Sequence, residues 1–328
     1  MLDLSVIRKF VFSGTNSAVP AMIHVHPLRG GLESCGTARV RVEGHDRDFV
    51  VKAVSGRAAR EIAIYRALGR GRVADIAPKL LGWRRAGAGA YAFLEWVPGA
   101  DAWPWRDEKT VSLVLSQLAR IHIHHPSPLS GFPRGWDYDA ELRQSAQATV
   151  EACRVAFQSG VRPGRHARVR TVERLARSLP SIRRQLIDFT GTSLIHGDAH
   201  PGNAVITRRD GKAHAVLLDW GRARVGSPLE DVCSWVQTLA FWEPVVRKRH
   251  DSLLRSYRRA RGLEDRLSRE FRDACWLAGA CNGFAGALRY HLAVAMDPCV
   301  TGKQRTESLH AAADWLRIMR RAEACWRN

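Results

Sequence analysis

The segment at residues 194–203, LIHGDAHPGN, constrains the fold of this chain more than any other stretch. It is followed by two short apolar runs, at 204–207 and 215–218, with Arg-Asp-Gly-Lys between them. Two such runs around an Asp-Gly pair are typical of a β-hairpin. The sequence therefore predicts a two-stranded hairpin that begins directly after a polar, histidine-containing loop.

Three polar side chains flank this hairpin. Asp198 and Asn203 precede it, and Asp219 follows its second strand. Because a hairpin returns to the point where it began, these side chains should converge at its base. Phosphoryl transfer requires a carboxylate that receives the proton of an attacking hydroxyl, and further oxygen ligands that hold Mg²⁺ on the nucleotide phosphates. Asp198 fits the first role, and Asn203 and Asp219 fit the second.

A lysine and a glutamate upstream support this interpretation. Lys52 lies inside an apolar strand predicted at 48–54, where an unpaired ammonium would be costly, so it should find an anion. Glu61, on a helix predicted at 58–68, can supply one, and such a pair can hold nucleotide phosphates. The turn at 29–34, Arg-Gly-Gly-Leu-Glu-Ser, could bring backbone N–H groups close to phosphate, although alone it is a weak signal.

Taken in order, these motifs resemble those of the aminoglycoside phosphotransferase and choline kinase-like family. The anchors extend over about residues 25–240 and read GGLES, VVKAV, REIAIYRAL, FLEWVPG, HGDAHPGN and LLDWGRARVGSPLEDV. The histidine-containing loop, followed by a strand pair and Asp-Trp, is the most specific of them. The C-terminal helices are compatible with the family but carry no motif.

The resemblance implies an α+β, bilobal protein-kinase-like fold. A small N-terminal lobe, with an antiparallel sheet and one helix, would span residues 1–96 and bind the nucleotide. A larger, mainly helical lobe, residues 97–328, would carry the catalytic loop and the substrate site. The implied reaction transfers the γ-phosphate of ATP, or of GTP, to a hydroxyl of a small molecule with the help of Mg²⁺.

The resemblance also implies roles for individual residues. Asp198 would be the catalytic base, and Asn203 and Asp219 would bind the metal. His196 would orient the loop, and Asp231 would brace it from a later helix. The residues implied in nucleotide binding are Gly30, Gly31, Ser34, Lys52, Glu61, Glu95, Trp96 and Val97.

The phosphate acceptor stays open at this point. An aminoglycoside or another antibiotic is expected first, whereas choline, ethanolamine, another amino alcohol or a sugar are alternatives. A nucleotide-binding protein without transfer activity and a nucleic-acid-binding protein that uses its arginine-rich segments are further alternatives. An amine-rich acceptor needs an acidic pocket, for which the C-terminal half offers Glu230, Glu243, Asp251, Glu264, Asp265, Glu270, Asp273, Asp297, Glu307 and Asp314.

Charge weakens the assignment of an amine-rich acceptor. The formal net charge is +19 and the pI is about 10.6, which opposes long-range steering of a cation. Arginine-rich segments at 162–184 and 247–261 are interpreted as solvated helix faces, because no aromatic interleaving or motif indicates nucleic-acid binding. Arg222 and Arg224 depart from the family pattern, and they are expected either to contact phosphate or to face solvent.

The remaining features indicate a cytoplasmic protein whose oligomeric state is open. The seven cysteines form no Cys-x-x-Cys pair, which favours reduced thiols. The N-terminus lacks a secretory pattern, and the most apolar stretch, 274–288, is shorter than the ~20 residues that span a membrane. His122, His124 and His125 are interpreted as partners of a helix end rather than as metal ligands.

Overall fold

The computed structural model describes residues 2–12, 22–28, 36–44, 47–99, 103–124, 131–133, 135–161, 163 and 168–327. The turn at 29–34 lies outside the described residues, and with it Gly30, Gly31 and Ser34. Their predicted contact with phosphate therefore stays a prediction. His125 lies outside the described residues as well.

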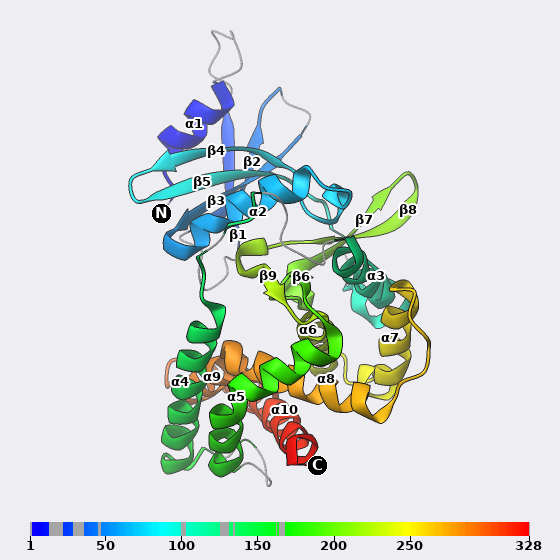
Figure 1. Ribbon diagram of the computed structural model, residues 1–328. Helices are drawn as coiled ribbons and strands as arrows, with labels where there is room; N and C mark the ends of the chain where they lie inside the picture. The colour runs from blue at the N-terminus through cyan, green and yellow to red at the C-terminus, as the bar shows by residue number, and fades with distance from the viewer. Residues whose placement is uncertain are drawn as a thin grey trace.

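The N-terminal part of the chain forms an antiparallel sheet with a helix on each face (Figure 1). The strand order is β1-β2-β3-β5-β4. One helix lies above the sheet and the other between the sheet and the helical part below. These elements are β1 (Ile23–Leu28), β2 (Gly36–Val42), β3 (Phe49–Ser55), β4 (Leu80–Ala86), β5 (Gly89–Glu95), α1 (Leu4–Phe12) and α2 (Arg60–Gly69).

Alternation along the strands decides which side chains meet which helix. Val51 and Phe93 share a buried cluster with Ile7 of α1. Because successive strand residues point to opposite faces, Lys52 and its neighbour across the sheet, Ala92, face the other way, toward α2. Sheet geometry therefore turns Lys52 toward the helical part of the molecule.

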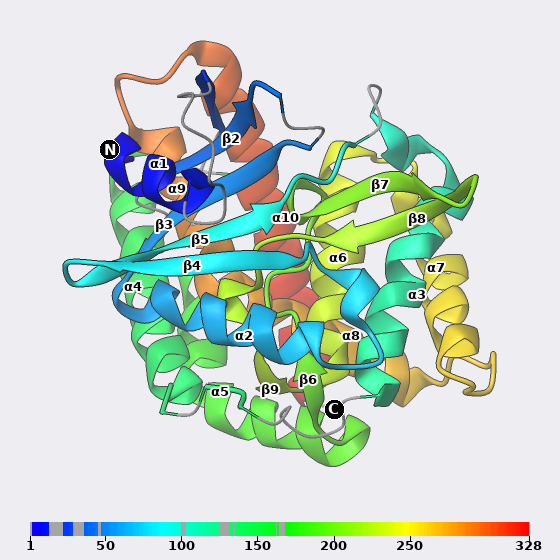
Figure 2. The ribbon, with the colours of Figure 1, turned by 90° about the horizontal axis from the view of Figure 1, so that it is seen from above.

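The rest of the chain is mainly helical and lies below the sheet. Seen from above, the sheet and α2 cover the helices, with the hairpin β7–β8 beside them (Figure 2). The helices are α3 (Glu108–His124), α4 (Tyr138–Gln158), α5 (Val169–Thr190), α6 (Pro228–Trp242), α7 (Val246–Ala260), α8 (Arg269–Asn282), α9 (Leu288–Met296) and α10 (Gly302–Arg327). The short strands are β6 (Ser193–Ile195), β7 (Ala204–Arg209), β8 (Lys212–Leu217) and β9 (Arg224–Gly226).

Several predicted elements are confirmed by these bounds. The hairpin after the polar loop is β7–β8, with Arg209 paired to Lys212 next to its turn. Helix α6 begins at Pro228, and its start is fixed by a capping box of Ser227 and Glu230. The mixed architecture agrees with the predicted α+β fold.

Two local features of the structure differ from the sequence pattern. The segment before Gly30 has poor strand character in its sequence, yet it contains both helix α1 and strand β1. Burial of Ile7 against the sheet stabilises α1. A proline inside a helical pattern usually ends or kinks the helix, whereas α5 continues through Pro180. Helix α5 contacts α4, α8 and α10, and buried side chains lie on both sides of Pro180.

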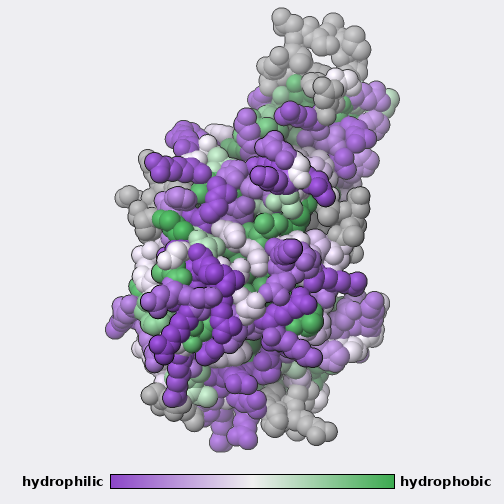
Figure 3. Space-filling model, turned by 90° about the vertical axis from the view of Figure 1, so that its right-hand side faces the viewer, coloured by the Kyte–Doolittle hydropathy of each residue, from purple (hydrophilic) through white to green (hydrophobic). Residues whose placement is uncertain are grey.

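The surface is largely hydrophilic. Purple side chains cover most of the face in Figure 3, with smaller apolar areas between them. Among the helices of the described ranges, none combines the length and the apolar character needed to span a lipid bilayer.

Phe93 should be a large contributor to the stability of the N-terminal part. Its ring is fully buried and stacks on Phe10 of α1, with the ring centroids 3.7 Å apart. Phe93→Ala should therefore lower the free energy of unfolding by about 3–5 kcal/mol, measured by urea denaturation. Trp83→Ala, on a side chain that is 43% exposed, is the control and should change it by less than about 1 kcal/mol. Equal effects of the two substitutions would contradict the expected packing.

Candidate active site

A buried ammonium joins two carboxylates at the junction of the two parts of the molecule. Lys52 Nζ lies 2.8 Å from Glu61 Oε2 and 2.9 Å from Asp219 Oδ1. Lys52 comes from the sheet, Glu61 from α2, and Asp219 from the end of the hairpin. The structure thus confirms the predicted pair between Lys52 and Glu61 and adds to it Asp219, which lies far along the chain.

The pKa values of Lys52, Glu61 and Asp219 reflect the placement of one cation between two carboxylates. Burial raises the pKa of Glu61 to about 7, against the opposing effect of Lys52. Burial also acts to raise the pKa of Asp219, but the Lys52 ammonium brings it below its ordinary value. For Lys52, burial acts to lower the pKa, and the two carboxylates reverse this and raise it. Lys52 and Asp219 are therefore the ionised pair, and Glu61 titrates near neutrality.

The backbone at Asp219 is strained. Its φ is +56° and its ψ is 70°, in the left-handed region that side chains with a Cβ rarely adopt. Such strain persists where the surroundings over-determine a conformation, and it clusters at functional sites. Here it accompanies the ion pair that turns the Asp219 carboxylate toward Lys52.

His196 couples the loop of Asp198 to the segment before Asp219. Its Nε2 lies 2.8 Å from the carbonyl oxygen of Leu218, which can only accept, so Nε2 carries the proton. Its Nδ1 then accepts from the backbone N–H of Asp198 at 3.3 Å. The imidazole is fully buried and lies edge-on to Trp220, with ring centroids 4.6 Å apart. These contacts suit an orienting role.

Asp231 fixes the same loop from the first turn of α6. Its carboxylate accepts from the backbone N–H groups of His196 and Gly197, at 2.6 and 2.7 Å, and lies 3.3 Å from His122 Nε2. Burial acts to raise the pKa of Asp231, but its hydrogen bond and charge interaction with His122 bring it below its ordinary value. A carboxylate near a helix N-terminus is also favoured by the helix dipole.

His122 is part of this support, as the interpretation of a helix-end histidine suggests. Its Nδ1 lies 2.7 Å from the hydroxyl of Tyr257, and the imidazole is buried. Within the ranges described above, no group of three or more His, Cys, Asp or Glu side chains is arranged to hold a metal ion.

Asp198 and Asn203 lie together at the base of the hairpin. Asn203 Nδ2 donates to the backbone oxygen of Asp198 at 3.0 Å and to Asp198 Oδ2 at 3.2 Å. The backbone N–H of Leu218 donates to the Asn203 backbone oxygen at 2.8 Å, which ties the loop to the second strand. The Asp198 side chain is 41% exposed, so a molecule in solution can reach it.

The donor set fits a cation that is shared with phosphate. Mg²⁺ in proteins is commonly bound through one or two carboxylates together with substrate phosphates and waters, rather than by an all-protein cage. Asp219 can offer a carboxylate, and Asn203 can offer an amide oxygen. The lack of a protein-only metal cluster among the described residues is compatible with that mode.

The connection between the lobes carries an aromatic side chain held by an arginine. Glu95 ends β5, and its Oε2 accepts from the backbone N–H of Lys79 at 3.2 Å. The Arg39 guanidinium lies 4.5 Å from the centroid of the Trp96 ring. Of the two tryptophans that follow, Trp105 is buried and Trp103 is 44% exposed.

Arg224 corrects one sequence-based expectation. It was expected to contact phosphate or to face solvent, yet it is buried and pairs with Glu230 Oε2 at 2.6 Å. It also donates to the Gly197 carbonyl at 3.2 Å and lies 3.6 Å from the ring centroid of Tyr138. Glu230 is therefore a structural carboxylate and does not line an acceptor pocket. The Ser-Pro-Leu-Glu start of α6 is the sequence signal for that role, since it is a capping box.

Sequence reasoning missed Arg60, the neighbour of Glu61. Its guanidinium donates to the carbonyl oxygens of Gly221 and Ala223, at 3.2 and 2.8 Å. Both carbonyls belong to the segment that follows Asp219. No spacing rule links a helix start to a segment so far along the chain, so the sequence carries no signal for this contact.

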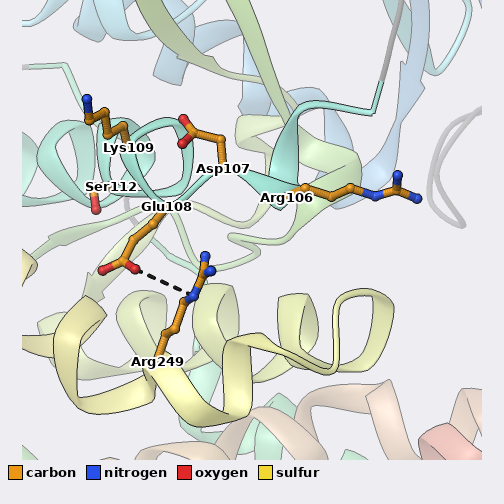
Figure 4. Close-up of a pocket in the computed structure, with 6 residues that line it drawn as sticks. All are labelled: Arg106, Asp107, Glu108, Lys109, Ser112 and Arg249. Carbon is orange, nitrogen blue, oxygen red and sulfur yellow. Dashed lines mark ion pairs between the residues drawn. The ribbon is translucent and has the colours of Figure 1, made fainter.

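A large surface cavity lies away from these residues. It measures about 530 Å³ and is bounded by the start of α3 and by α7 (Figure 4). The pair between Glu108 and Arg249, 3.6 Å apart, crosses it. None of the predicted site residues lines it; the lining residues are Arg106, Asp107, Glu108, Lys109, Ser112 and Arg249.

Several solved structures of small-molecule kinases share the overall fold. A choline kinase from Cryptosporidium parvum has 9% identity and a TM-score of 0.64, covering 99% of this chain and 97% of its own. A microcompartment-associated aminopropanol kinase has 15% identity and a TM-score of 0.60, covering 97% of both chains. An aminoglycoside phosphotransferase from Streptomyces rimosus, in complex with ADP and streptomycin, has 18% identity and a TM-score of 0.55, covering 86% and 99%. The predicted kinase-like fold is thereby confirmed.

The sequence comparison identifies the family. Residues 25–272 match the phosphotransferase enzyme family, so the chain belongs to that family. The resemblance inferred from the motifs is confirmed. A comparison with curated protein sequences finds no significant match.

Ionisation of Glu61 should make the stability of the nucleotide-free protein depend on pH. Its pKa rises from 4.5 to about 7 on folding, so the folded state binds more protons between these values. Proton binding by Glu61 stabilises the folded state. This contribution to the free energy of unfolding is fully present below pH 4.5, and about 3 kcal/mol of it is lost as pH rises through about 7. Glu61→Gln removes this titration, so urea denaturation should show the variant gaining stability relative to wild type as pH rises. Glu151→Gln, on an exposed side chain, should show no such trend, and a pH-independent effect of Glu61→Gln would refute the expectation.

Proposed function

We propose that the protein is an ATP- and Mg²⁺-dependent phosphotransferase that acts on a hydroxyl of a small molecule. The observation that carries this proposal is the convergence of Lys52, Glu61 and Asp219 beside the loop of Asp198 and Asn203. Membership of the phosphotransferase enzyme family supports it. So does the presence of ADP in a structure of the same fold. GTP is the alternative nucleotide.

Each residue of the site has a proposed role. Lys52 holds the α- and β-phosphates, and Glu61 steadies it. Asp219 and Asn203 hold Mg²⁺, which when bound neutralises charge on the β- and γ-phosphates. The connection at Glu95, Trp96 and Val97 meets the base of the nucleotide, and Gly30, Gly31 and Ser34 approach its phosphates. Residues 1–96 form the nucleotide lobe, and residues 97–328 form the catalytic and acceptor lobe.

Asp198 is the proposed base. Its half-exposed carboxylate orients the acceptor hydroxyl and receives its proton. The acceptor oxygen forms a bond to the γ-phosphorus while the bond from that phosphorus to the β–γ bridging oxygen breaks, which leaves the nucleoside diphosphate. The hydrogen bonds from Asn203 and the anchoring by His196 and Asp231 keep the carboxylate in place during the transfer.

For the acceptor we propose an amine-bearing alcohol, an aminoglycoside or another antibiotic first and choline, ethanolamine or another amino alcohol as the alternative. A sugar without an amine is a further alternative. An aminoglycoside phosphotransferase with streptomycin and a choline kinase share the fold. Glu243 offers a carboxylate beside two exposed indoles: it accepts from Trp103 Nε1 at 2.7 Å, and the Trp103 and Trp242 rings are 6.3 Å apart. Indole faces and a carboxylate together suit an ammonium group. The cytoplasmic location expected from the cysteines is part of the same proposal.

Asp198→Asn should abolish most of the transfer. A screen for nucleotide consumption against aminoglycosides, other antibiotics, amino alcohols and sugars identifies the acceptor. With that acceptor, the variant should lose about 100- to 10,000-fold in kcat, because removing a general base costs this much. Its affinity for nucleotide should stay within about twofold. Asp188→Asn, an exposed residue of α5, is the matched control, and wild-type turnover by Asp198→Asn would exclude the assigned role.

Glu243→Gln tests the proposed class of acceptor. Loss of the carboxylate should raise KM for an amine-bearing acceptor by about tenfold and leave kcat nearly unchanged, because a charge contact of about 1–2 kcal/mol is removed. Glu307→Gln, on the exposed part of α10, serves as the control. If Glu243→Gln behaves like this control with every amine acceptor, the acceptor is bound elsewhere.

A further inference from the structure

A tryptophan and a glutamate of the helical lobe meet two arginines, one at the first residue of α2 and one in the turn just before it. Trp136 precedes α4, and its ring centroid lies 4.8 Å from the Arg57 guanidinium and 4.6 Å from that of Arg60. Arg222 approaches the same ring at 5.9 Å. Figure 1 shows the N-terminal end of α4 rising to α2 at this point. We call Arg57, Arg60, Trp136, Glu141 and Arg222 the Trp136 cluster.

Glu141 holds the cluster together. Its carboxylate lies 2.9 Å from Arg57 Nη1 and 3.3 Å from Arg222 Nη2, and it accepts from Trp136 Nε1 at 2.7 Å. Among the described contacts of the cluster, Glu141 thus pairs with two guanidinium groups and with the indole N–H. The pKa of Arg60 is lowered to about 10 by burial and by the neighbouring arginines Arg57 and Arg224. Repulsion among these arginines would therefore grow if Glu141 lost its charge.

The cluster connects directly to the site. Arg60 donates to the carbonyls of Gly221 and Ala223, in the segment that follows Asp219. The next residue, Glu61, pairs with Lys52. Two successive residues at the start of one helix therefore fix the Asp219 segment and the lysine. The position of this helix end decides whether both contacts can exist at once.

We propose that Glu141 and Trp136 are positioning residues for phosphoryl transfer, which hold the N-terminal end of α2 on the helical lobe and so keep Glu61 against Lys52. The expected effect of these residues on catalysis rests on the proposed function. Their expected effect on the position of α2 does not, because it concerns the protein without nucleotide. Neither residue touches the reacting groups.

The test compares Glu141→Gln with Glu151→Gln. Both residues are on α4, and Glu151, whose side chain is 64% exposed, pairs only with its helix neighbour Arg154 among the described ion pairs. Hydrogen exchange in the nucleotide-free protein should be roughly three- to tenfold faster over α2 in Glu141→Gln, the effect of losing two partly exposed ion pairs. It should be unchanged over α10. Glu151→Gln should leave both regions as in wild type.

Kinetics provide the second measurement. Glu141→Gln should raise KM for the nucleotide by roughly three- to tenfold and lower kcat, with KM for the acceptor within about twofold. Glu141→Asp should restore part of the loss, and Trp136→Phe, which keeps a ring but loses the N–H donor, should give an intermediate effect.

A uniform increase in hydrogen exchange over the whole chain would overturn the proposal, since it indicates general destabilisation. The proposal would also be overturned if hydrogen exchange over α2 were as slow in Glu141→Gln as in Glu151→Gln.

Failure of the two proposals can be told apart. If wild-type protein transfers phosphate to no acceptor, the proposed function fails, and the exchange data still decide whether Glu141 holds α2. If wild type is active and Glu141→Gln matches wild type in both measurements, the positioning role fails and the phosphotransferase assignment stands.

Discussion

The buried ammonium of Lys52 is the constraint on which the arrangement of the two lobes depends. A charge in this position must be paired, because the cost of leaving it unpaired exceeds what a single domain can usually tolerate. Its two partners come from α2 and from the segment after the hairpin. Pairing the Lys52 ammonium thus requires α2 of the same lobe and the segment after β8 of the other lobe to lie side by side. The candidate site lies where these elements come together.

The first turn of α6 performs a similar task in the helical lobe. Asp231 binds the backbone of the Asp198 loop, and the adjacent Glu230 binds Arg224 after the hairpin. Both carboxylates are buried, and removing one partner of such a contact leaves the other uncompensated. The loop that carries Asp198 and the segment that follows Asp219 are therefore anchored to one rigid helix end, which fixes their separation.

The sequence was sufficient for contacts whose partners are marked by a motif. The hairpin between Asp198 and Asp219 follows from two apolar runs and a turn, and the Lys52–Glu61 pair follows from a charge inside an apolar strand. The contacts of Arg60, Trp136 and Arg224 could not be predicted, because each links elements that are distant along the chain and no periodicity relates them. Helix α1 was missed for a related reason, since its buried face is defined by the sheet on which it packs.

Pairing within the chain also bears on the high positive charge. Several acidic residues that could have formed an acceptor pocket are bound to arginines of the same lobe, as Asp251 is to Arg272 at 2.7 Å and Asp265 to Arg259 at 2.9 Å. Glu243 differs, because its nearest donor is the Trp103 indole and its arginine partner, Arg106, is largely exposed and 3.6 Å away. An exposed partner at that distance is readily displaced, since surface ion pairs contribute about 0–1 kcal/mol. Of these acidic residues, the Glu243 carboxylate, beside the Trp103 indole, therefore remains the most available for the proposed ammonium group even though the protein as a whole carries a high positive charge.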